Sequence, residues 1–312
     1  MVTSSADFFA AIKGNNTYIL SDSLDDRKRL AIQVKIYTPV FKQAIGLALG
    51  KAELWTKLKD PNATFRILDL GCGEGLYLPI LNQYLIDQGA KAHLTMVGVD
   101  RDTVAISTAQ EYMAALGLRN SQFFVHNITS PLTQIEGLNL NNPSNHFDLV
   151  FASTILMHVR EPQTVLQHIY KVLKPGGAFY TKDMAWGLDI INYPSLAFTR
   201  LANMLQKLTL KMLGEDFGAN PAKFVEAVGF ENIEWFEDSY PIGGRTEEGR
   251  RILEIFLLGQ HAARGIFVKL GAISAEEYDG LMEQEFREIS ADLEGQFKLV
   301  NTIARRPLSI IG

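Results

Sequence analysis

The sequence predicts an α/β fold in which helices flank a mostly parallel sheet, and two observations carry this prediction. Strand and helix patterns alternate from Phe65 to about Asp183, which is typical of a parallel sheet with helices on both faces. Within this region, a buried strand runs through Asp69 into a glycine-rich loop and then into a helix. The 312 residues, 47% hydrophobic and 21% charged, have the composition of an ordinary globular protein with a sizeable core.

Before this region, residues 1–60 are expected to form a helical lid. Pro39 disfavours helical geometry at Thr38, so the pattern predicts two helices, the second beginning with Thr38 as its cap and continuing towards Leu58. The apolar positions at helical spacing are Leu30, Val34, Tyr37, Phe41 and Ile45.

The alternating region predicts its own element boundaries. Strands are expected near residues 65–70, 94–99, 122–126, 147–153 and 177–183, and helices near 76–88, 103–116 and 162–173. The run Lys174-Pro175-Gly176-Gly177 predicts a turn that redirects the chain into the fifth strand.

After Asp183 the pattern becomes mainly helical. We expect a helix over about 195–213, one from Pro221 to Val228 that ends at Gly229, a strand over 233–240, helices over 246–294 with a break near Gly271, and a last strand over 297–304. The expected organisation is a lid (1–60), a core (61–240) with a helical insertion at about 184–213, a helical cap (241–295) and the last strand of the core (296–312).

Composition narrows the function classes. The net charge of −5 and the lack of a long basic run argue against a broad nucleic-acid footprint, although they leave a local patch open. The single cysteine, Cys72, fits a reducing compartment, and the chain has neither a signal-peptide pattern nor an apolar run of about 18 residues, so a cytoplasmic protein without a membrane span is expected. The spacing of the histidines and carboxylates indicates no metal site.

The glycine loop, Gly71-Cys72-Gly73-Glu74-Gly75, indicates a nucleotide site. Glycines at alternate positions let the backbone bend sharply and approach a ligand where a Cβ would collide. The G-x-G-x-G spacing differs from the G-x-G-x-x-G loop that binds a pyrophosphate, so it favours a nucleoside without phosphates.

Polar residues at neighbouring strand ends extend this site. Asp100 follows the second strand, where its carboxylate can accept two hydrogen bonds from ribose hydroxyls; the alternative is a helix cap, a task that Asp102 can serve. Asn127 follows the third strand and could bind an adenine amino group, or simply stabilise a turn. Ser153 ends the fourth strand and would face the cofactor, while His158 in the next loop could face cofactor or substrate.

These features together resemble class I S-adenosylmethionine-dependent methyltransferases. The resemblance covers about 65–183, and the extra helices look, more loosely, like those of small-molecule methyltransferases from natural-product and quinone pathways. It implies a Rossmann-like, seven-stranded sheet with an antiparallel last strand. The matching motifs are Asp69-Leu70-Gly71-Cys72-Gly73-Glu74-Gly75, Gly98-Val99-Asp100, Phe147-Asp148-Leu149-Val150, Leu156-Met157-His158-Val159 and Leu173-Lys174-Pro175-Gly176-Gly177.

The resemblance also assigns roles to residues. It implies that Asp69, Gly71 and Gly73 shape the pocket for the methionine part of S-adenosylmethionine and that Asp100 holds the ribose. It further places Asn127 and Ile128 beside the adenine and Ser153 near the methionine end. The chain departs from the family at Asn127, where aspartate is common; an amide still offers an acceptor oxygen.

The chemistry of methyl transfer selects the remaining candidates. Alignment of donor and acceptor supplies much of the rate, and a base is needed only where the acceptor must lose a proton. His158 is the best-placed base, with a structural role as the alternative, and Asp183 is the second candidate, with a loop cap as the alternative. Tyr37, Trp186 and Tyr193 could line an apolar substrate pocket, although aromatic residues at helical spacing are also typical of a core.

The predicted function is methylation of a small organic molecule by S-adenosylmethionine, with S-adenosylhomocysteine as the product and oxygen as the first choice of acceptor. Nitrogen and carbon acceptors stay open, as do a protein or nucleic-acid methyltransferase, a nucleotide-dependent oxidoreductase and a cofactor-binding protein without activity. The sequence leaves the oligomeric state open, a homodimer included.

Overall fold

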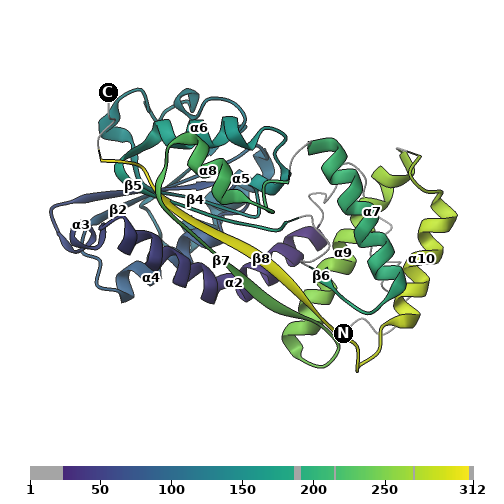
Figure 1. Cartoon of the computed structure of the whole chain (residues 1–312). Coiled ribbons are helices and arrows are strands. Elements are labelled where there is room, and N and C mark those ends of the chain that lie inside the picture. Colours follow the sequence, from purple (N-terminus) through teal and green to yellow (C-terminus); the bar gives the residue numbers. More distant parts are fainter. Residues whose placement is uncertain (1–23, 186–190, 214–215, 270, 309–312) are drawn as a thin grey trace. The chain divides into compact units, whose positions relative to one another are not determined.

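The computed structural model describes residues 24–185, 191–213, 216–269 and 271–308 (Figure 1). The helices are α2 (Leu24–Lys51), α3 (Trp55–Lys59), α4 (Tyr77–Asp87), α5 (Thr103–Ala115), α6 (Pro162–Val172), α7 (Leu196–Leu213), α8 (Pro221–Val228), α9 (Glu247–Lys269) and α10 (Ala275–Glu288), with short 3-10 helices η1 (Leu132–Gln134), η2 (Pro143–Asn145) and η3 (Leu156–His158). The strands are β1 (Thr64–Leu70), β2 (His93–Asp100), β3 (Ser121–Val125), β4 (Phe147–Ser153), β5 (Leu173–Asp183), β6 (Ile191–Asn192), β7 (Glu231–Gly243) and β8 (Glu294–Arg305).

The described residues form two compact units. Among the described residues, the sheet unit draws on 38–185, 213, 216–238 and 299–308, and the helical unit draws on 24–37, 191–212, 239–269 and 271–298. No described helix combines the length and the apolar character needed to cross a membrane.

The sheet has the predicted topology. Its strand order is β3-β2-β1-β4-β5-β8-β6, with β7 also paired to β8. Strands β1 to β5 are parallel to one another, whereas β8 runs antiparallel to β5. The two-residue β6, antiparallel to β8, is an addition to the seven expected strands. A mostly parallel, Rossmann-like sheet with an antiparallel last strand is therefore confirmed.

Helices cover both faces of the sheet in the sheet unit. One face packs against α6 and α8 in a buried apolar cluster that includes Val150, Phe179 and Ile169. The other face packs against α2 and α4, where the Phe41 ring lies 5.3 Å from Phe151 between centroids. In Figure 1, α6 and α8 lie above the strands and α2 and α4 below them. Because side chains alternate along a strand, this division decides which strand-end residues can meet.

The predicted helix break at Pro39 is wrong. Residues Leu24–Lys51 form one helix with Pro39 inside it and Thr38 as an interior residue, not a cap. Pro39 and Lys35, whose carbonyl loses its helical partner, are both exposed, so water can satisfy that carbonyl and the helix continues. The helix ends at Lys51 instead of continuing towards Leu58, because the chain turns at Glu53 (φ 57°) before α3.

The fifth strand begins earlier than predicted. β5 includes Lys174-Pro175-Gly176-Gly177, which was expected to form a turn ahead of the strand. The predicted bend is present as an irregularity inside the strand: the β4–β5 register shifts between Phe147 and Leu149, and Gly176 has a φ of 77°. The N–H of Gly176 donates to Arg306 at 2.9 Å, which keeps this segment paired.

The helical unit contains the predicted late helices, and α9 and α10 are separated near Gly271 (φ 66°) as expected. Its apolar cluster includes Leu201, Phe267 and Tyr278 from three helices. Two hydrogen bonds to one carboxylate oxygen also join the start of α7 to α10. The Ser195 hydroxyl donates to Glu288 at 2.6 Å, and the backbone N–H of Ala197 donates to the same oxygen at 3.1 Å.

Candidate active site

The glycine loop joins β1 to α4 and is tied to the end of β2. The N–H groups of Gly71 and Cys72 both donate to the Val99 carbonyl, at 2.8 and 2.9 Å. Gly71, Gly73 and Gly75 have φ values of 71°, 52° and 72°, a region in which residues with a Cβ are strained. The predicted sharp bend is therefore present, and glycine is required at each alternate position.

The three glycines face different surroundings. A Cβ on Gly71 would lie 2.5 Å from the Ile155 side chain, and one on Gly75 would lie 2.8 Å from Phe123. A Cβ on Gly73 would meet nothing within 4 Å. The first and third glycines are therefore needed for packing, whereas the space beside Gly73 is open to a ligand. The nearby Cys72 thiol has its pKa raised by burial and by Asp69 and Asp100, which argues against a reactive thiolate.

Asp100 links the end of β2 to this loop. One carboxylate oxygen accepts from the Gly73 N–H at 2.9 Å, and the other accepts from the Asp102 N–H at 3.0 Å. The helix-cap role belongs to Asp102, whose side chain accepts from Val104 and Ala105 at the start of α5. Asp100 is half-buried beside the glycine loop, which is the position that its predicted ribose role requires.

Asp69 is a buried carboxyl group under the same loop. It is 2% exposed, and its Oδ2 has no hydrogen-bond partner among the described residues. Burial, and then the charge of Asp100, raises the pKa of Asp69 well above its ordinary value. An orphaned buried oxygen is costly and indicates a place for a ligand donor.

The end of β3 holds the predicted adenine contacts. The Asn127 side-chain oxygen accepts from both the N–H and the hydroxyl of Thr129, at 3.1 and 3.0 Å, so it forms the turn that was the alternative to adenine binding. An adenine amino group would have to compete with Thr129 for this oxygen. Asn127 itself is exposed, and Ile128 is half-buried against the apolar cluster under α6.

The loop after β4 is held by Asp183. This fully buried carboxylate accepts from the Met157 N–H at 3.0 Å and from the Thr181 hydroxyl at 2.5 Å, and burial raises its pKa to about 7. These contacts are those of a loop anchor. His158 is the last residue of η3 and is exposed, so Asp183 positions the turn that carries His158.

Ser153 lies next to two residues that sequence reasoning missed. The parallel register pairs Ser153 of β4 with Lys182 of β5, and the Ser153 hydroxyl neighbours that of Tyr77. Lys182 is fully buried and donates to the Tyr77 hydroxyl at 3.0 Å. The available signal was the lysine that follows Ala178-Phe179-Tyr180-Thr181 within one predicted strand, because a strand in the middle of such a sheet is buried on both faces.

Two of the three predicted substrate residues, Tyr37 and Tyr193, belong to the helical unit. Tyr37 is 2% exposed, with its ring 4.9 Å from that of Tyr240, and Tyr193 is 4% exposed, with its ring 4.9 Å from Phe198. Both therefore have packing roles, although the Tyr193 hydroxyl has no hydrogen-bond partner among the described residues. Trp186 lies outside the described residues.

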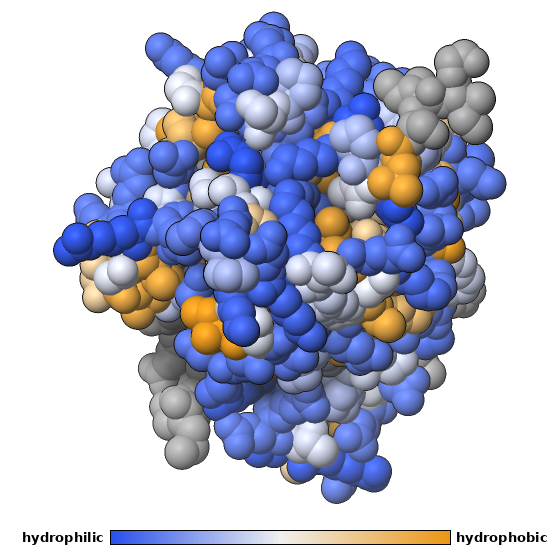
Figure 2. All heavy atoms as spheres, turned by 90° about the vertical axis from the view of Figure 1, so that its left-hand side faces the viewer, coloured by the Kyte–Doolittle hydropathy of each residue, from blue (hydrophilic) through white to orange (hydrophobic). Residues whose placement is uncertain are grey.

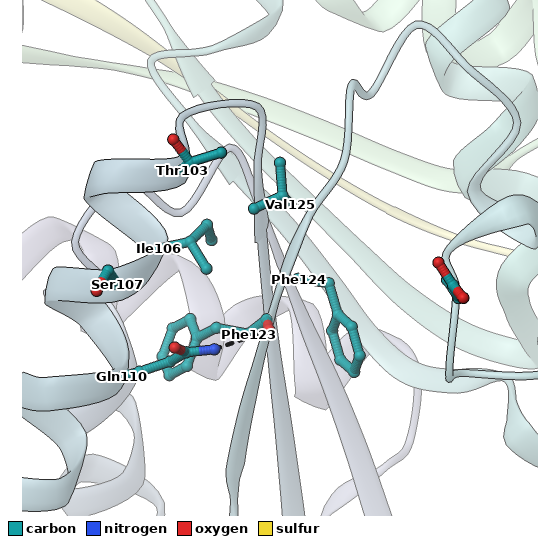
Figure 3. A pocket seen from close by; sticks show the side chains of 8 residues that line it. Thr103, Ile106, Ser107, Gln110, Phe123, Phe124 and Val125 are labelled. Atoms are coloured by element: carbon teal, nitrogen blue, oxygen red, sulfur yellow. Dashed lines mark hydrogen bonds between the residues drawn. The ribbon is translucent and has the colours of Figure 1, made fainter.

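A cavity of about 460 Å³ opens between α5 and β3 (Figure 3). Gln110 crosses it and donates to the Phe123 carbonyl at 3.4 Å. None of the predicted site residues lines this cavity, although its lining residue Phe123 packs against Gly75 of the glycine loop. The lining residues are Thr103, Ile106, Ser107, Gln110, Phe123, Phe124, Val125 and Glu136.

On the face drawn in Figure 2, hydrophilic residues dominate and apolar residues occur in small separate groups. Within the described ranges, no group of three histidine, cysteine or acidic side chains is arranged to hold a metal ion.

Comparison with known proteins gives a consistent result. Residues 61–235 match the methyltransferase domain family. Mouse arsenite methyltransferase is 31% identical over 167 residues, which are 52% of this chain but only 43% of that protein. The tRNA 5-carboxymethoxyuridine methyltransferase of Escherichia coli (strain K12) is 26% identical over 232 residues, 71% of this chain and 78% of that protein. The structure of the YcgJ protein from Bacillus subtilis aligns with a TM-score of 0.51 at 14% identity, over 83% of this chain and 98% of that chain, which concerns the fold alone.

Proposed function

The chain belongs to the methyltransferase domain family, as an S-adenosylmethionine-dependent enzyme, and from this premise we propose that it methylates a small organic molecule. Oxygen is the first choice of acceptor atom. One observation carries the proposal: the space beside Gly73 is open, and the Gly73 N–H is bonded to the Asp100 carboxylate, whose charge acts on the buried, orphaned carboxyl of Asp69.

The residues of this site fit the cofactor. S-adenosylmethionine supplies a methyl group on a positively charged sulfur, which is already activated for transfer. In this proposal, Asp69, Gly71, Gly73 and Ser153 hold the methionine end, Asp100 accepts from the ribose hydroxyls, and Asn127 and Ile128 flank the adenine. Asp69 offers a buried oxygen to a donor such as the methionine ammonium, which would stabilise the ionised carboxyl.

A small acceptor is favoured by charge. The chain carries −5 overall without a long basic run, whereas a polyanionic acceptor is usually bound by a positive surface. His158 and Asp183 are the sequence-predicted bases for removal of a hydroxyl proton. His158 is exposed and accessible, whereas Asp183 is fully buried with both oxygens engaged, so we propose His158 ahead of Asp183.

A second function is favoured by one relative. The bacterial tRNA methyltransferase is similar over 71% of this chain, more than the arsenite methyltransferase covers, so tRNA is the leading alternative acceptor.

We also propose a cytoplasmic location, on the strength of the single cysteine.

The test begins with the cofactor and proceeds to the acceptor. Calorimetry should find binding of S-adenosylhomocysteine and none of NAD; preferential binding of NAD would overturn the cofactor assignment. Mass spectrometry of small molecules that stay bound through purification would then supply candidate acceptors. Transfer from S-adenosylmethionine labelled on the methyl group should be measured in parallel with those candidates, with phenols and amines, and with total tRNA.

Each result has a defined meaning. Label on a small molecule supports the proposal, and label on tRNA alone refutes it in favour of the alternative. Tight binding of S-adenosylhomocysteine together with no transfer to a co-purified acceptor would favour a cofactor-binding protein without activity.

A further inference from the structure

A fully buried lysine lies at the carboxyl end of β5. Lys182 is 0% exposed, its Nζ donates to the Tyr77 hydroxyl at 3.0 Å, and the amine lies 5.3 Å from the centre of the Tyr77 ring. Ser153 is its register partner on β4, with a hydroxyl beside that of Tyr77. Two adjacent strand ends and the first residue of α4 thus bring polar groups to one point.

Aromatic rings surround this point. Phe41 lies 4.5 Å from the Tyr77 ring and 6.0 Å from the Tyr180 ring, and Phe151 lies 6.5 Å from Tyr77, all between centroids. An amine among such rings costs free energy that an apolar side chain of similar length would avoid. Packing alone therefore does not explain a lysine at this position.

The charged groups around Lys182 come from several elements. Asp183 is its neighbour on β5, and Asp238 lies on β7; both carboxylates raise the pKa of Lys182, but the larger effect of burial lowers it to about 7. Burial likewise raises the pKa of Tyr77, to which Asp69 of β1 adds, while Ser153 lowers it. The phenol is thus held protonated, and the amine can exist uncharged near neutral pH.

The position of this pair relative to the cofactor residues matters. Tyr77 begins α4, two residues after Gly75 of the glycine loop, and its pKa responds to Asp69 beneath that loop. Ser153 and Lys182 end strands β4 and β5. In parallel sheets, ligands bind at the carboxyl ends of the strands, next to the point where the strand order reverses. The pair therefore lies at the strand ends where the proposed function places the methionine part of the cofactor.

We propose that Tyr77 and Lys182 form a proton relay that accepts the proton of a hydroxyl-bearing acceptor during methyl transfer, a role that rests on the proposed function. Tyr77 is the catalytic residue, because its oxygen would contact the acceptor. Lys182 acts through Tyr77 and is the positioning residue. The relay selects acceptors with a weakly acidic O–H group, such as phenols.

The step balances in atoms and charge. The acceptor oxygen forms a bond to the methyl carbon while the carbon–sulfur bond breaks, and the electron pair of that bond leaves the sulfur neutral. The acceptor proton moves to the Tyr77 oxygen, and the Tyr77 proton moves to the uncharged Lys182 amine, which becomes an ammonium. Between turnovers the ammonium returns a proton to the Tyr77 oxygen, and the Tyr77 hydroxyl releases one to the water that replaces the product.

Titration of Lys182 tests the relay without an acceptor. Carbon-13 NMR of protein labelled at lysine Cε should show one signal that titrates near pH 7 and is missing in Lys182→Met. The titration midpoint of Lys182 should shift in Tyr77→Phe. It should stay unchanged in the control Tyr180→Phe, which removes a neighbouring buried hydroxyl that is bonded to Asn301 at 2.9 Å. A Lys182 midpoint above about 9 would overturn the relay, because the amine would then be charged throughout the neutral range.

The pH–rate profile supplies the second readout, with phenol acceptors from the screen above. Wild type and Tyr180→Phe should share a rise in rate near pH 7, and Tyr77→Phe and Lys182→Met should lose that rise together with about 100-fold in rate. Binding of S-adenosylhomocysteine should stay within about threefold in every variant. Wild-type pH–rate profiles in both Tyr77→Phe and Lys182→Met would refute the relay and leave the proposed function standing. Failure of the wild-type protein to bind S-adenosylhomocysteine would refute the proposed function.

Discussion

Replacement of Asp100 by alanine tests the cofactor site most directly. The carboxylate would accept two hydrogen bonds from ribose hydroxyls, and hydrogen bonds to charged groups contribute about 1.5–3 kcal/mol each. Asp100 is half-buried and already accepts from Gly73 and Asp102, so the lower figure applies to each bond. The sum of about 3 kcal/mol corresponds to a loss of about 150-fold in affinity.

The same variant also releases the glycine loop. Without the carboxylate, the Gly73 N–H loses its acceptor at 2.9 Å, and we expect the free energy of unfolding to fall by about 1–3 kcal/mol. Calorimetry with S-adenosylhomocysteine measures the first effect, and urea unfolding without ligand measures the second.

Asp102→Ala is the matched control. It removes the cap of α5, whose contacts to Val104 and Ala105 are 2.7 and 3.2 Å, at a cost of about 1 kcal/mol in stability. The Asp102 N–H, which donates to Asp100, is a backbone group and remains. Affinity should therefore stay within about twofold of wild type. Unchanged affinity in Asp100→Ala, or an equal loss in Asp102→Ala, would refute the ribose role.

Three further predictions concern stability, pH and turnover. Asp148→Ala should lower the free energy of unfolding by about 3–5 kcal/mol in urea, because Asp148 is 2% exposed and holds Lys57 and Lys174 at 2.6 and 2.8 Å. Burial raises the pKa of Glu285 to about 8 from 4.5, so its proton stabilises the folded state below pH 4.5 and this contribution disappears as the pH rises to about 8. Glu285→Gln should therefore make urea midpoints between pH 5 and 8 less dependent on pH. His158→Ala should lower turnover while the affinity for S-adenosylhomocysteine stays unchanged, as calorimetry would show.

Control variants separate these effects from general damage. Glu234→Ala removes an exposed ion pair with Lys51 in the same unit as Asp148 and should cost no more than about 1 kcal/mol. Glu283→Gln changes an exposed carboxylate on the same helix as Glu285 and should keep the wild-type pH slope. An Asp148→Ala loss no larger than that of Glu234→Ala, or equal slopes in Glu285→Gln and wild type, would contradict the reasoning. A fully active His158→Ala would return that residue to a structural role.

The sheet could be predicted because its signals are local. Each parallel strand is a short, mainly apolar run, and a polar residue at or next to its last position, Asp69, Asp100 or Ser153, marks where three of them end. The break at Pro39 was predicted wrongly for the opposite reason. A proline inside a helix leaves the carbonyl four residues earlier without its helical hydrogen bond. Whether water can replace that bond depends on the exposure of the carbonyl in the folded protein, which the local sequence does not show.

The sequence predicted the positions of residues in the candidate site but not all of their contacts. The position of Asp100 could be predicted because it ends β2, and its contact with Gly73 follows from the parallel order of the sheet. The partners of Asp183 and Lys182 do not, because Met157 and Tyr77 are 26 and 105 residues away in the chain. Spacing along a sequence does not show which loop returns to a strand end.

The alternation of β5 directs the two side chains at this strand end to different partners. Lys182 lies with Tyr180 on the aromatic face towards Tyr77, whereas Asp183 binds Met157 in the turn that carries His158. A shift of one residue would exchange the two side chains between faces. The strand therefore supports both candidate bases, an exposed imidazole and a buried relay.

These two bases predict different behaviour. If His158 instead removes the acceptor proton, a small basic buffer such as imidazole should restore part of the rate to His158→Ala, because a histidine in water exchanges its proton with buffer directly. Lys182 is 0% exposed, so the same buffer should not restore Lys182→Met. If imidazole restores the rate of both variants, the enclosed relay is refuted. If it restores neither, and the pH–rate profile is altered only in Lys182→Met, proton removal is assigned to Tyr77 and Lys182.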